Sequence, residues 1–345
     1  MDITADNTTI KPRTTEELAL LESRPETGFS RTLSHGVLAA PLVAGGAAIV
    51  EYLLLPNFES NESGNAYLVF LSALLVLWAL VCAVSLFDSK VYAKARYKAP
   101  FYTFILALLL IYDYLTLKTG RLMPPYFPWV DQIFTAALND RAYLAQCAFN
   151  SLKLLFTGYF LGAAAGIITG IACGYNKKIN YWISPFLKLL GAIPSITWLP
   201  VVLVLAGTLF QGSVFIIALG VWFALTIASM TGINNIDKSY YEAARTLGAT
   251  NIQLISRIAL PCALPNIFQG LLQGMSSACT ALLIAEMIGV ESGLGWYITW
   301  QKSWAHFAHM YAAIALICII FVVVNHLLGR VKNRVLRWQQ GVVRE

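Results

Sequence analysis

The sequence is short of charged residues. Only 12% of its 345 residues are Asp, Glu, Lys or Arg, whereas 58% are hydrophobic. A soluble domain carries about 25% charged residues, so about half of the usual charge is missing. The remaining charges lie in short blocks between long apolar runs, an arrangement typical of helices that cross a membrane several times. The composition therefore argues against a soluble protein with an oversized core.

Motifs for catalysis and metal binding are missing as well. The stretch 207–213 has two glycines at the gap of a GxxxxGK[ST] phosphate-binding loop, but Ser213 stands where that motif requires lysine. The chain is therefore not expected to hydrolyse ATP by that chemistry. The histidines form no HExxH motif, and His306 and His309 have no adjacent carboxylate, so no metal site is expected.

The six cysteines follow no pattern of disulfides or metal ligands. None is in CxxC spacing and most lie inside apolar segments, so we interpret them as small buried hydrophobic residues. They are Cys82, Cys147, Cys173, Cys262, Cys279 and Cys318.

Long apolar segments dominate the rest of the chain. They cover 37–55, 66–87, 100–117, 146–174, 184–208, 212–232, 266–289 and 306–328. Each is close to or above the length of about 20 residues that a helix needs to cross the hydrocarbon core, and isolated strands cannot pair their backbone groups there. The sequence predicts an all-α integral membrane protein with about eight transmembrane helices. The polar residues 1–36 are expected to form a cytoplasmic tail, since the first apolar run begins too late for a cleavable signal peptide.

The basic residues indicate which side of the membrane each loop faces. The net charge of +6 comes from Lys and Arg that cluster in the loops 88–99, 175–180 and 233–265 and in the tail 331–345, whereas the loop 56–65 has none. The positive-inside rule places these clusters, and both termini, in the cytoplasm. This topology explains the positive charge better than binding of nucleic acid.

The segment 118–145 departs from this pattern. It carries basic residues on the predicted outer side, and its prolines prevent one continuous helix. These residues are Lys118, Arg121, Arg141, Pro124, Pro125 and Pro128. We expect an external elbow that lies on the membrane surface.

The fourth apolar segment carries a glycine at every fourth position. At helical spacing these glycines form one flat stripe that allows another helix to approach closely. They are Gly158, Gly162, Gly166, Gly170 and Gly174. We predict a packing role for this stripe, with a part in a transport path as the alternative.

The cytoplasmic loop 233–265 is predicted to contain two short helices. Ser239 and Glu242 match a capping box that would start the first helix at Tyr240, and Gly248 can adopt the left-handed conformation that ends it. Thr250 and Gln253 match a second capping box, and Pro261 is expected to stop the second helix. Ile252, Ile255 and Ile258 are expected to turn an apolar stripe toward the membrane core. A compact protrusion of this kind favours docking of a soluble partner.

This loop resembles the EAA coupling motif of binding-protein-dependent ABC importer permeases. The resemblance rests on Glu242, Ala243 and Ala244, on Gly248, and on Ile258-Ala259-Leu260-Pro261. It implies that Glu242, Ala243, Ala244, Gly248, Leu260 and Pro261 couple the chain to an ATPase subunit.

The resemblance extends over roughly 100–338 and is strongest to the nitrate, sulfonate, taurine and bicarbonate branch. It is carried by Pro185 to Pro200, by Ala285-Glu286-Met287-Ile288-Gly289, and by Ser292-Gly293-Leu294-Gly295. It implies a type I ABC importer fold with a permease core at 100–330 and a coupling helix at 239–260. Residues 37–99 then form two additional N-terminal transmembrane helices of open purpose, and 331–345 form a cytoplasmic tail. The aromatic stretch 300–307 departs from the branch and leaves the substrate open.

The family also implies the partners and the location. These are ABC ATPase subunits, which bind ATP and Mg, a solute-binding protein, a second permease subunit and the lipid bilayer. No cofactor is expected in this chain. ATP hydrolysis is expected to reside in the separate ATPase subunits, so this chain is not expected to be an enzyme. The location implied is a bacterial cytoplasmic membrane.

Polar residues inside membrane segments are costly and mark functional candidates. Pro194 interrupts the fifth segment, and Ser195 and Thr197 add hydroxyls beside it, as is typical of a helix that lines a cavity. We predict a translocation path at Pro194, Ser195, Thr197 and Trp198, with Glu286 as a gate or as a structural residue at the glycine-rich turn that follows it. Weaker candidates are Trp222, Gln269 and Gln273, and Asp113 is expected to be solvated or paired.

Two other classes of function, a secondary transporter and a membrane-embedded enzyme, predict features that the sequence can be checked for. An ion-coupled secondary transporter would predict intramembrane charge pairs and inverted repeats, and neither is found in the sequence. A membrane-embedded enzyme would need a nucleophile–base or metal set, which is also missing. For an importer, the resemblance favours a small anion such as a sulfonate, nitrate or bicarbonate, with a heterocyclic vitamin precursor as the alternative.

Overall fold

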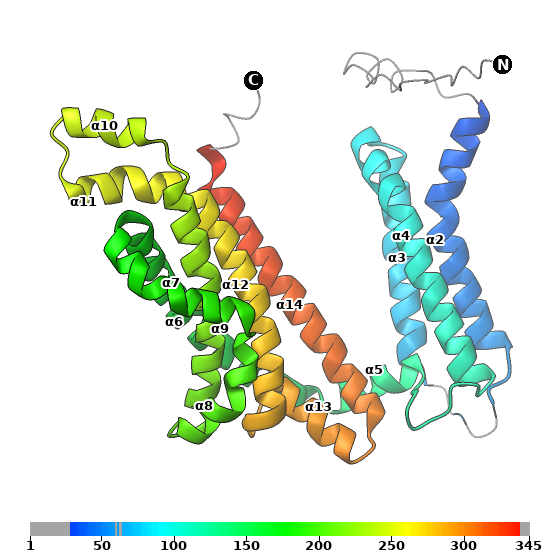
Figure 1. Ribbon diagram of the computed structural model, residues 1–345. Helices are drawn as coiled ribbons and strands as arrows, with labels where there is room; N and C mark the ends of the chain where they lie inside the picture. Colours follow the sequence, from blue (N-terminus) through cyan, green and yellow to red (C-terminus); the bar gives the residue numbers. More distant parts are fainter. Residues whose placement is uncertain (1–27, 59–60, 62–63, 339–345) are drawn as a thin grey trace, which may run out of the picture. The chain divides into compact units, whose positions relative to one another are not determined.

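The computed structural model describes residues 28–338 except 59–60 and 62–63, and this part of the chain is entirely helical (Figure 1). Among the described residues, 7 helices are long and apolar enough to cross a membrane, and one bent pair passes the same test together. The prediction of an all-α membrane protein with about eight spans is confirmed. Most of the predicted tail 1–36, the loop residues Glu59 and Glu62, and residues 339–345 lie outside the described residues.

The chain divides into two compact units, Met1–Arg121 and Leu122–Glu345. We refer to them as the N-terminal unit and the core unit. The N-terminal unit contains α2 (Gly28–Leu54), α3 (Ala66–Ser85), α4 (Ser89–Asp113) and the π-helical turn η1 (Tyr114–Lys118).

The third apolar segment belongs to the N-terminal unit. The sequence analysis assigned 100–117 to the permease core, whereas in the structure this segment lies within α4 and η1 and packs on α2 and α3. The buried Ala95 and Ala99 of α4 permit close approach of neighbouring helices. Trp78 of α3 also meets Tyr102 edge to face, with ring centroids 5.2 Å apart.

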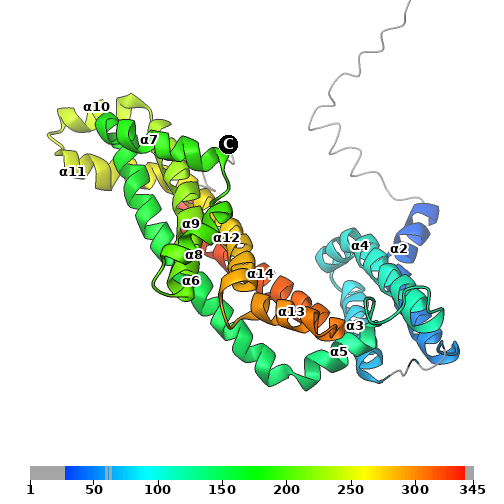
Figure 2. The same cartoon turned by 60° about the horizontal axis from the view of Figure 1, so that its bottom comes forward.

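The core unit contains the remaining elements. They are α5 (Val130–Asn139), α6 (Arg141–Tyr175), α7 (Lys177–Ala192), the 3-10 turn η2 (Ser195–Trp198), α8 (Leu199–Leu205), α9 (Leu209–Asn234), α10 (Lys238–Thr246), α11 (Asn251–Leu254), the π-helical turn η3 (Ile255–Ala259), α12 (Leu260–Gly289), α13 (Leu294–Ser303) and α14 (Phe307–Val335). Within this unit α10 and α11 lie at one end and α13 at the other (Figures 1 and 2).

The glycine stripe of α6 packs along α9. A Cβ added at Gly170 would lie 2.6 Å from Ser229 Cβ, and one added at Gly166 would lie 2.7 Å from Leu225 Cβ. Gly158 and Gly174 meet Ile217 and Ile233 of α9 in the same way. The predicted packing role of the stripe is therefore confirmed.

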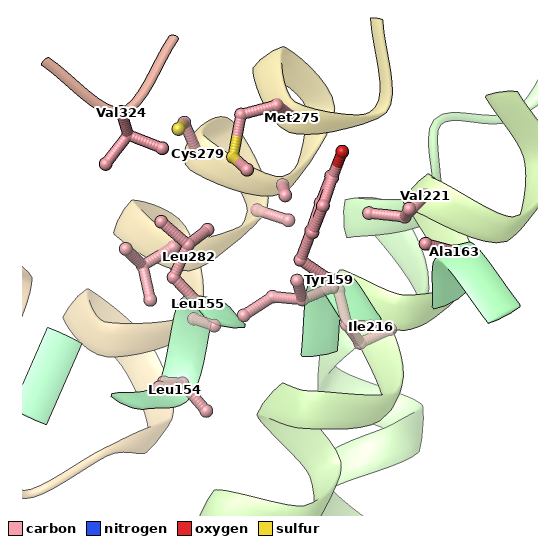
Figure 3. Close-up of a cluster of buried hydrophobic side chains, with 14 of the residues drawn as sticks. Leu154, Leu155, Tyr159, Ala163, Ile216, Val221, Met275, Cys279, Leu282 and Val324 are labelled. Atoms are coloured by element: carbon pink, nitrogen blue, oxygen red, sulfur yellow. The ribbon is translucent and has the colours of Figure 1, made fainter. Parts of the chain in front are cut away.

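The hydrophobic core of this unit lies where α6, α9 and α12 meet (Figure 3). Its buried side chains include Leu154, Leu155, Ile216, Val221, Met275 and Leu282, and Val324 of α14 joins them. The hydroxyl of Tyr159, a partly polar member of the cluster, donates to the carbonyl of Leu271 at 3.0 Å. This bond satisfies the buried hydroxyl and ties α6 to α12.

The fifth predicted segment, 184–208, is broken. Helix α7 ends at Ala192, and the chain resumes with η2 and α8 after a bend of 92°. Pro194 accounts for the break, because it lacks a backbone N–H and disfavours the helical conformation at Ile193. Ile193 is extended, with φ −119° and ψ 117°.

The second helix of the cytoplasmic loop does not stop at Pro261, which corrects the sequence prediction. The span Asn251–Gly289 is one helix of 39 residues that runs from α11 through η3 into α12. The π-helical turn directly precedes Pro261, and Pro261 lies in the first turn of α12. In these positions the missing N–H of proline costs little.

The segment 118–145 has the predicted interruption. The chain leaves η1 at Lys118, forms turns up to Trp129, and then enters the short helix α5 before α6 begins at Arg141. Its surface position relative to the membrane stays a prediction.

Candidate translocation path and coupling element

A cavity of about 630 Å³ lies between α7, η2, α9 and α12. Its polar lining residues are Ser195, Gln269, Gln273, Ser277 and Thr280. Apolar groups such as Phe223 and Ile227 of α9 complete the wall. None of the described residues that line this cavity is ionisable, so its polarity comes from neutral hydroxyl and amide groups.

Two hydroxyls of the cavity converge above Gly220. A Cβ added at this glycine of α9 would lie 2.8 Å from Ser277 Oγ and 3.0 Å from Ser195 Oγ. The absence of a side chain at Gly220 thus leaves room for both hydroxyls to face the same space.

The amide of Gln269 is oriented by a lysine. Lys332 Nζ of α14 donates to Gln269 Oε1 at 3.1 Å. An ammonium can only donate, so the oxygen of the amide faces Lys332 and the NH₂ group is left to donate elsewhere. Gln269 also lines the cavity, so its NH₂ group is available as a donor at the cavity wall.

The structure separates the predicted path residues. Pro194 and Ser195 line the cavity, whereas the described part of the wall does not include Thr197 or Trp198. Trp198 packs against the hydrophobic core instead. Of the four residues of the 3-10 turn η2, Ser195 and Ile196 line the cavity.

The sequence analysis named Gln269 and Gln273 only as weaker candidates and missed Ser277, Thr280 and Gly220. A signal was present, because Gln269, Gln273, Ser277 and Thr280 recur at intervals of four or three residues. This spacing puts them on one face of a helix.

Glu286 has a structural position. It is 1% exposed, and its Oε2 accepts a hydrogen bond from the backbone N–H of Gly295 at 2.8 Å. Gly293 has φ +123°, and a Cβ there would lie 2.5 Å from the Glu286 carboxylate carbon. Ser151 of α6 fastens the same turn by accepting from the N–H of Leu294 at 2.8 Å. Glu286 thus anchors the glycine-rich turn between α12 and α13.

The cytoplasmic protrusion consists of α10 and α11, joined at Gly248. Gly248 has φ +80° and its N–H donates to the carbonyl of Arg245 at 2.9 Å. The predicted left-handed end of the first helix is confirmed. Thr250 and Gln253 form the second capping box as predicted, with Thr250 N–H donating to Gln253 Oε1 at 2.8 Å.

The start of α10 differs from the prediction. Its N-cap is Asp237, whose side chain accepts from the N–H of Ser239 at 2.9 Å, rather than Ser239 itself. The hydrogen bonds from Ser239 hold the pKa of Asp237 below its usual value. A carboxylate is a better acceptor than a hydroxyl and also interacts favourably with the helix dipole, which explains why Asp237 takes the cap.

The apolar stripe of the second helix also differs. Ile252, Ile255 and Ile258 were predicted to face the membrane core. In the structure Ile252 is 79% exposed, and the buried residues are Leu254, Ala259 and Ala263. The π-helical turn adds a residue to the helical repeat and therefore rotates the buried face.

The six predicted coupling residues occupy two levels of this element. Glu242, Ala243 and Gly248 are exposed and Ala244 is half-buried, whereas Leu260 and Pro261 lie in the first turn of α12 and are half-buried. A recess of about 480 Å³ separates α10 from the ends of α6 and α9, and Glu242 and Arg245 line it. Burial raises the pKa of Tyr241 in the same recess.

Helices that cross a membrane, a polar cavity between them, and a structured protrusion at one end together define a multi-pass membrane permease. Among the described residues no group of three or more His, Cys, Asp or Glu side chains is placed to hold a metal ion. Residues 162–338, half of the chain, match the family described as binding-protein-dependent transport system inner membrane component. The chain belongs to this family and is a permease subunit of an ABC importer.

Named relatives share this assignment. The nitrate import permease protein NrtB of Leptolyngbya laminosa is 26% identical over 61% of this chain and 75% of its own length. The taurine transport system permease protein TauC of Escherichia coli is 27% identical over 66% of this chain and 86% of its own length. The resemblance to the nitrate, sulfonate and taurine branch of permeases is confirmed.

A solved structure shares the fold. The crystal structure of an amino acid ABC transporter matches 58% of this chain and 98% of its own, with a TM-score of 0.50 and 20% identity. The fold is therefore that of a type I ABC importer permease, as the sequence predicts.

Proposed function

We propose that this subunit imports a small anion through the cavity between α7, η2, α9 and α12. It works as one of a pair of identical permease subunits, with two ATPase subunits on the cytoplasmic side and a solute-binding protein on the outer side. ATP and Mg are bound by the ATPase subunits, and this chain carries out no chemistry. Both termini face the cytoplasm of a bacterial cell, in accordance with the basic loops.

The continuity of one helix carries this proposal. The 39-residue helix Asn251–Gly289 begins in the cytoplasmic protrusion and ends at the turn anchored by Glu286. Along its length it bears Gln269, Gln273 and Ser277. A displacement of α10 and α11 by a docked ATPase is therefore transmitted directly to the cavity wall.

Alternating access is the mechanism that we propose, and this geometry supports it. ATP binding closes the ATPase pair, the protrusion moves with it, and the α12 helices of the two copies tilt so that the cavity opens outward. Hydrolysis reverses the movement. Gly248 fixes the angle between α10 and α11 because its left-handed backbone conformation strongly disfavours other residues.

An anionic solute is supported by the donors in the cavity. Hydroxyls of Ser195 and Ser277 and the NH₂ group of Gln269 can each donate to an oxyanion. The lack of an ionisable group among the described lining residues keeps binding weak enough for release, which a translocation path requires. Relatives named for nitrate and taurine transport support the same class.

A flat heterocyclic solute is the second candidate. A recess of about 300 Å³ at the junction of α12 and α13 is lined by Trp296, Trp300 and Glu291. The two indole rings stack with centroids 5.4 Å apart and an interplanar angle of 14°. An indole face also stacks well on a planar heterocycle.

A charge placed in the cavity tests the path. In proteoliposomes with the ATPase and the binding protein, Gln273→Glu should lower ATP-driven uptake of nitrate and ethanesulfonate on the order of 100-fold. Two like charges about 5 Å apart at an effective dielectric constant of about 20 repel by roughly 3 kcal/mol. Uptake of each anion is measured against uptake of a labelled pyrimidine.

Two matched variants control for folding and position. Gln273→Asn keeps the amide and should stay within a few-fold of the wild type, and Thr197→Asp puts the same charge on η2 outside the described lining. Wild-type anion uptake by Gln273→Glu would rule out this cavity as the path. The heterocyclic solute would be favoured if the complex takes up the pyrimidine but not the anions, and if Gln273→Glu lowers the uptake of the pyrimidine only slightly.

A further inference from the structure

Charged side chains are buried in the N-terminal unit. Glu51 of α2 and Lys118 of η1 are each 8% exposed, and Asp113 at the end of α4 is fully buried. A charge taken out of water is costly unless it is paired and hydrogen-bonded, and ionisable residues in membrane helices mark functional sites. The import mechanism proposed above does not use these three groups.

The ammonium group of Lys118 donates all of its hydrogen bonds to neutral oxygen atoms. Its Nζ donates to the carbonyls of Tyr52 at 2.9 Å and Leu55 at 2.8 Å and to Asn57 Oδ1 at 2.9 Å. An ammonium has three donors, so none remains for a carboxylate. Lys118 therefore caps the end of α2 and gives Glu51 no hydrogen bond.

The loop between α2 and α3 covers this end of the unit. Asn61 Nδ2 donates to the carbonyls of Thr116 and Leu117 at 3.3 Å each, and the N–H of Phe58 donates to Leu117 at 3.0 Å. These carbonyls are available because they lie at the C-terminal end of η1, where the last carbonyls of a helix have no partner within the helix. A π-helical turn such as η1 is found frequently at functional sites.

Glu51 is buried without a hydrogen bond in the described part of the chain. Both carboxylate oxygens are buried and accept no hydrogen bond from any residue that the structure describes. Lys118 from η1 and Tyr67 from α3 are within electrostatic range of Glu51, and Asp113 acts on the same two side chains. Tyr52, next to Glu51 on α2, meets Tyr67 edge to face with centroids 5.5 Å apart.

We propose that the Glu51 carboxylate binds one monovalent cation, a proton or a sodium ion, with Asp113 and the Tyr67 hydroxyl as neighbouring oxygens. Two carboxylates and one ammonium leave one excess negative charge in this cluster when all are ionised. A single bound cation neutralises that charge at Glu51, whose carboxylate no described donor reaches. Carboxylate and hydroxyl oxygens are ligands that hard cations prefer.

The site lies at the end of the unit where Asn57 and Asn61 contact η1, on the side that the basic residues predict to be external. Its occupancy therefore follows the cations outside the cell. A ligand that binds only the folded state stabilises it, so the bound cation holds the ends of α2, α3 and η1 together.

A reporter inside the unit tests this site in the full-length protein. Cys82 of α3 lies with its Sγ 3.9 Å from the carbonyl of Leu38 of α2, so its reactivity rises when α2 and α3 separate. With the other five cysteines replaced, thermal labelling of Cys82 is followed in sodium chloride and in choline chloride at one alkaline pH, and in choline chloride at acidic pH. Rates are normalised to a free thiol at each pH.

The expected result is a shift of the labelling midpoint by about 5 °C upward when the cation is present. A shift in sodium at alkaline pH identifies sodium, and a shift on acidification alone identifies a proton. Glu51→Gln should remove the shift, and Glu291→Gln, an exposed glutamate of the core unit, should retain it.

Absence of any shift in the wild type, or an unchanged shift in Glu51→Gln, overturns the proposal. If the Glu51→Gln protein does not accumulate, Glu51→Asp can test the site instead, because its side chain is one methylene shorter and moves the carboxylate away from the site. Its cation affinity should be at least about tenfold lower, a change of about 1.4 kcal/mol. Equal affinity of Glu51→Asp and the wild type would contradict the site.

Discussion

The two units of this chain treat charge in opposite ways. In the core unit, the described lining of the cavity is neutral, and the buried Glu286 accepts a hydrogen bond from the backbone of Gly295. In the N-terminal unit, Glu51, Asp113 and Lys118 are buried together, and the Glu51 carboxylate accepts no hydrogen bond from a described residue.

This difference in buried charge follows from the requirement that the transport path must release its solute. A path must let its solute go, and a fixed charge in a medium of low dielectric constant would hold a counter-ion too firmly. The N-terminal unit does not contain this path and has no such requirement. The N-terminal unit can therefore keep an unbalanced charge, provided that a small cation neutralises it.

The largest contrast between the units is expected at their glycines. Gly170→Leu inserts a side chain where even a Cβ would lie 2.6 Å from Ser229 Cβ, whereas the space around Gly46 of α2 is open to 4 Å. Overpacking costs typically about 1–3 kcal/mol and occasionally more, so Gly170→Leu should not accumulate in the membrane. Gly46→Leu should accumulate normally. Equal levels on a quantitative membrane blot would contradict the close packing of α6 on α9.

Glu286 distinguishes a structural carboxylate from a charged gate. Glu286→Ala leaves the N–H of Gly295 unpaired and should cost about 2–4 kcal/mol, seen as a lower midpoint of thermal unfolding. Glu286→Gln retains an acceptor for that N–H and should lose less than half as much, with anion uptake close to that of the wild type. A loss of uptake in a stable Glu286→Gln protein would make the charge itself functional.

Gly248 tests the coupling element without disturbing a contact. Nothing lies within 4 Å of a Cβ added there, so Gly248→Leu acts through its φ of +80° alone. The left-handed conformation costs a residue with a side chain about 1–2 kcal/mol. Substrate-stimulated ATP hydrolysis and uptake should fall together by about tenfold, with normal membrane levels. Full uptake would exclude the bend at Gly248 as a coupling feature, and the neighbouring Thr246→Leu serves as a control.

Removal of the N-terminal unit should have the smallest effect on uptake. A chain that begins with Met followed by Leu122 retains the whole core unit, and its uptake should stay within a few-fold of that of the full chain. The reason is that the cavity, the turn at Glu286 and the protrusion all lie after residue 121. A truncated complex that assembles with its ATPase but shows no uptake would assign the N-terminal unit to the transport machinery.

The sequence predicted the parts of the fold that depend on local signals. Apolar length gave the spans, four-residue spacing gave the glycine stripe of α6, and Gly248 with Thr250 and Gln253 gave the bend in the protrusion. These features depend on residues that are close together in the chain, so they can be predicted from a single sequence.

The failures concern prolines and long-range packing. The interruption at Pro194 was predicted correctly and is a bend of 92°, whereas the helix end predicted at Pro261 was wrong, because Pro261 follows a π-helical turn that the sequence does not reveal. The packing of α4 on α2, and the burial of Glu51 beside Lys118, depend on residues more than 60 positions apart. Thr197 and Trp198 do not belong to the described lining of the cavity, and Trp198 packs against the hydrophobic core instead.

The central claim, that the cavity is the path, is tested most directly by cysteine accessibility. Ser195→Cys and Ser277→Cys are compared with Ser229→Cys, which is buried between α9 and α6, in a protein without its native cysteines. Small anionic thiol reagents should label positions 195 and 277 at rates that differ between the nucleotide-free and the ATP-trapped complex, and should not label position 229. Unreactive cysteines at both 195 and 277 in every nucleotide state, in a protein that still transports, would contradict the assignment.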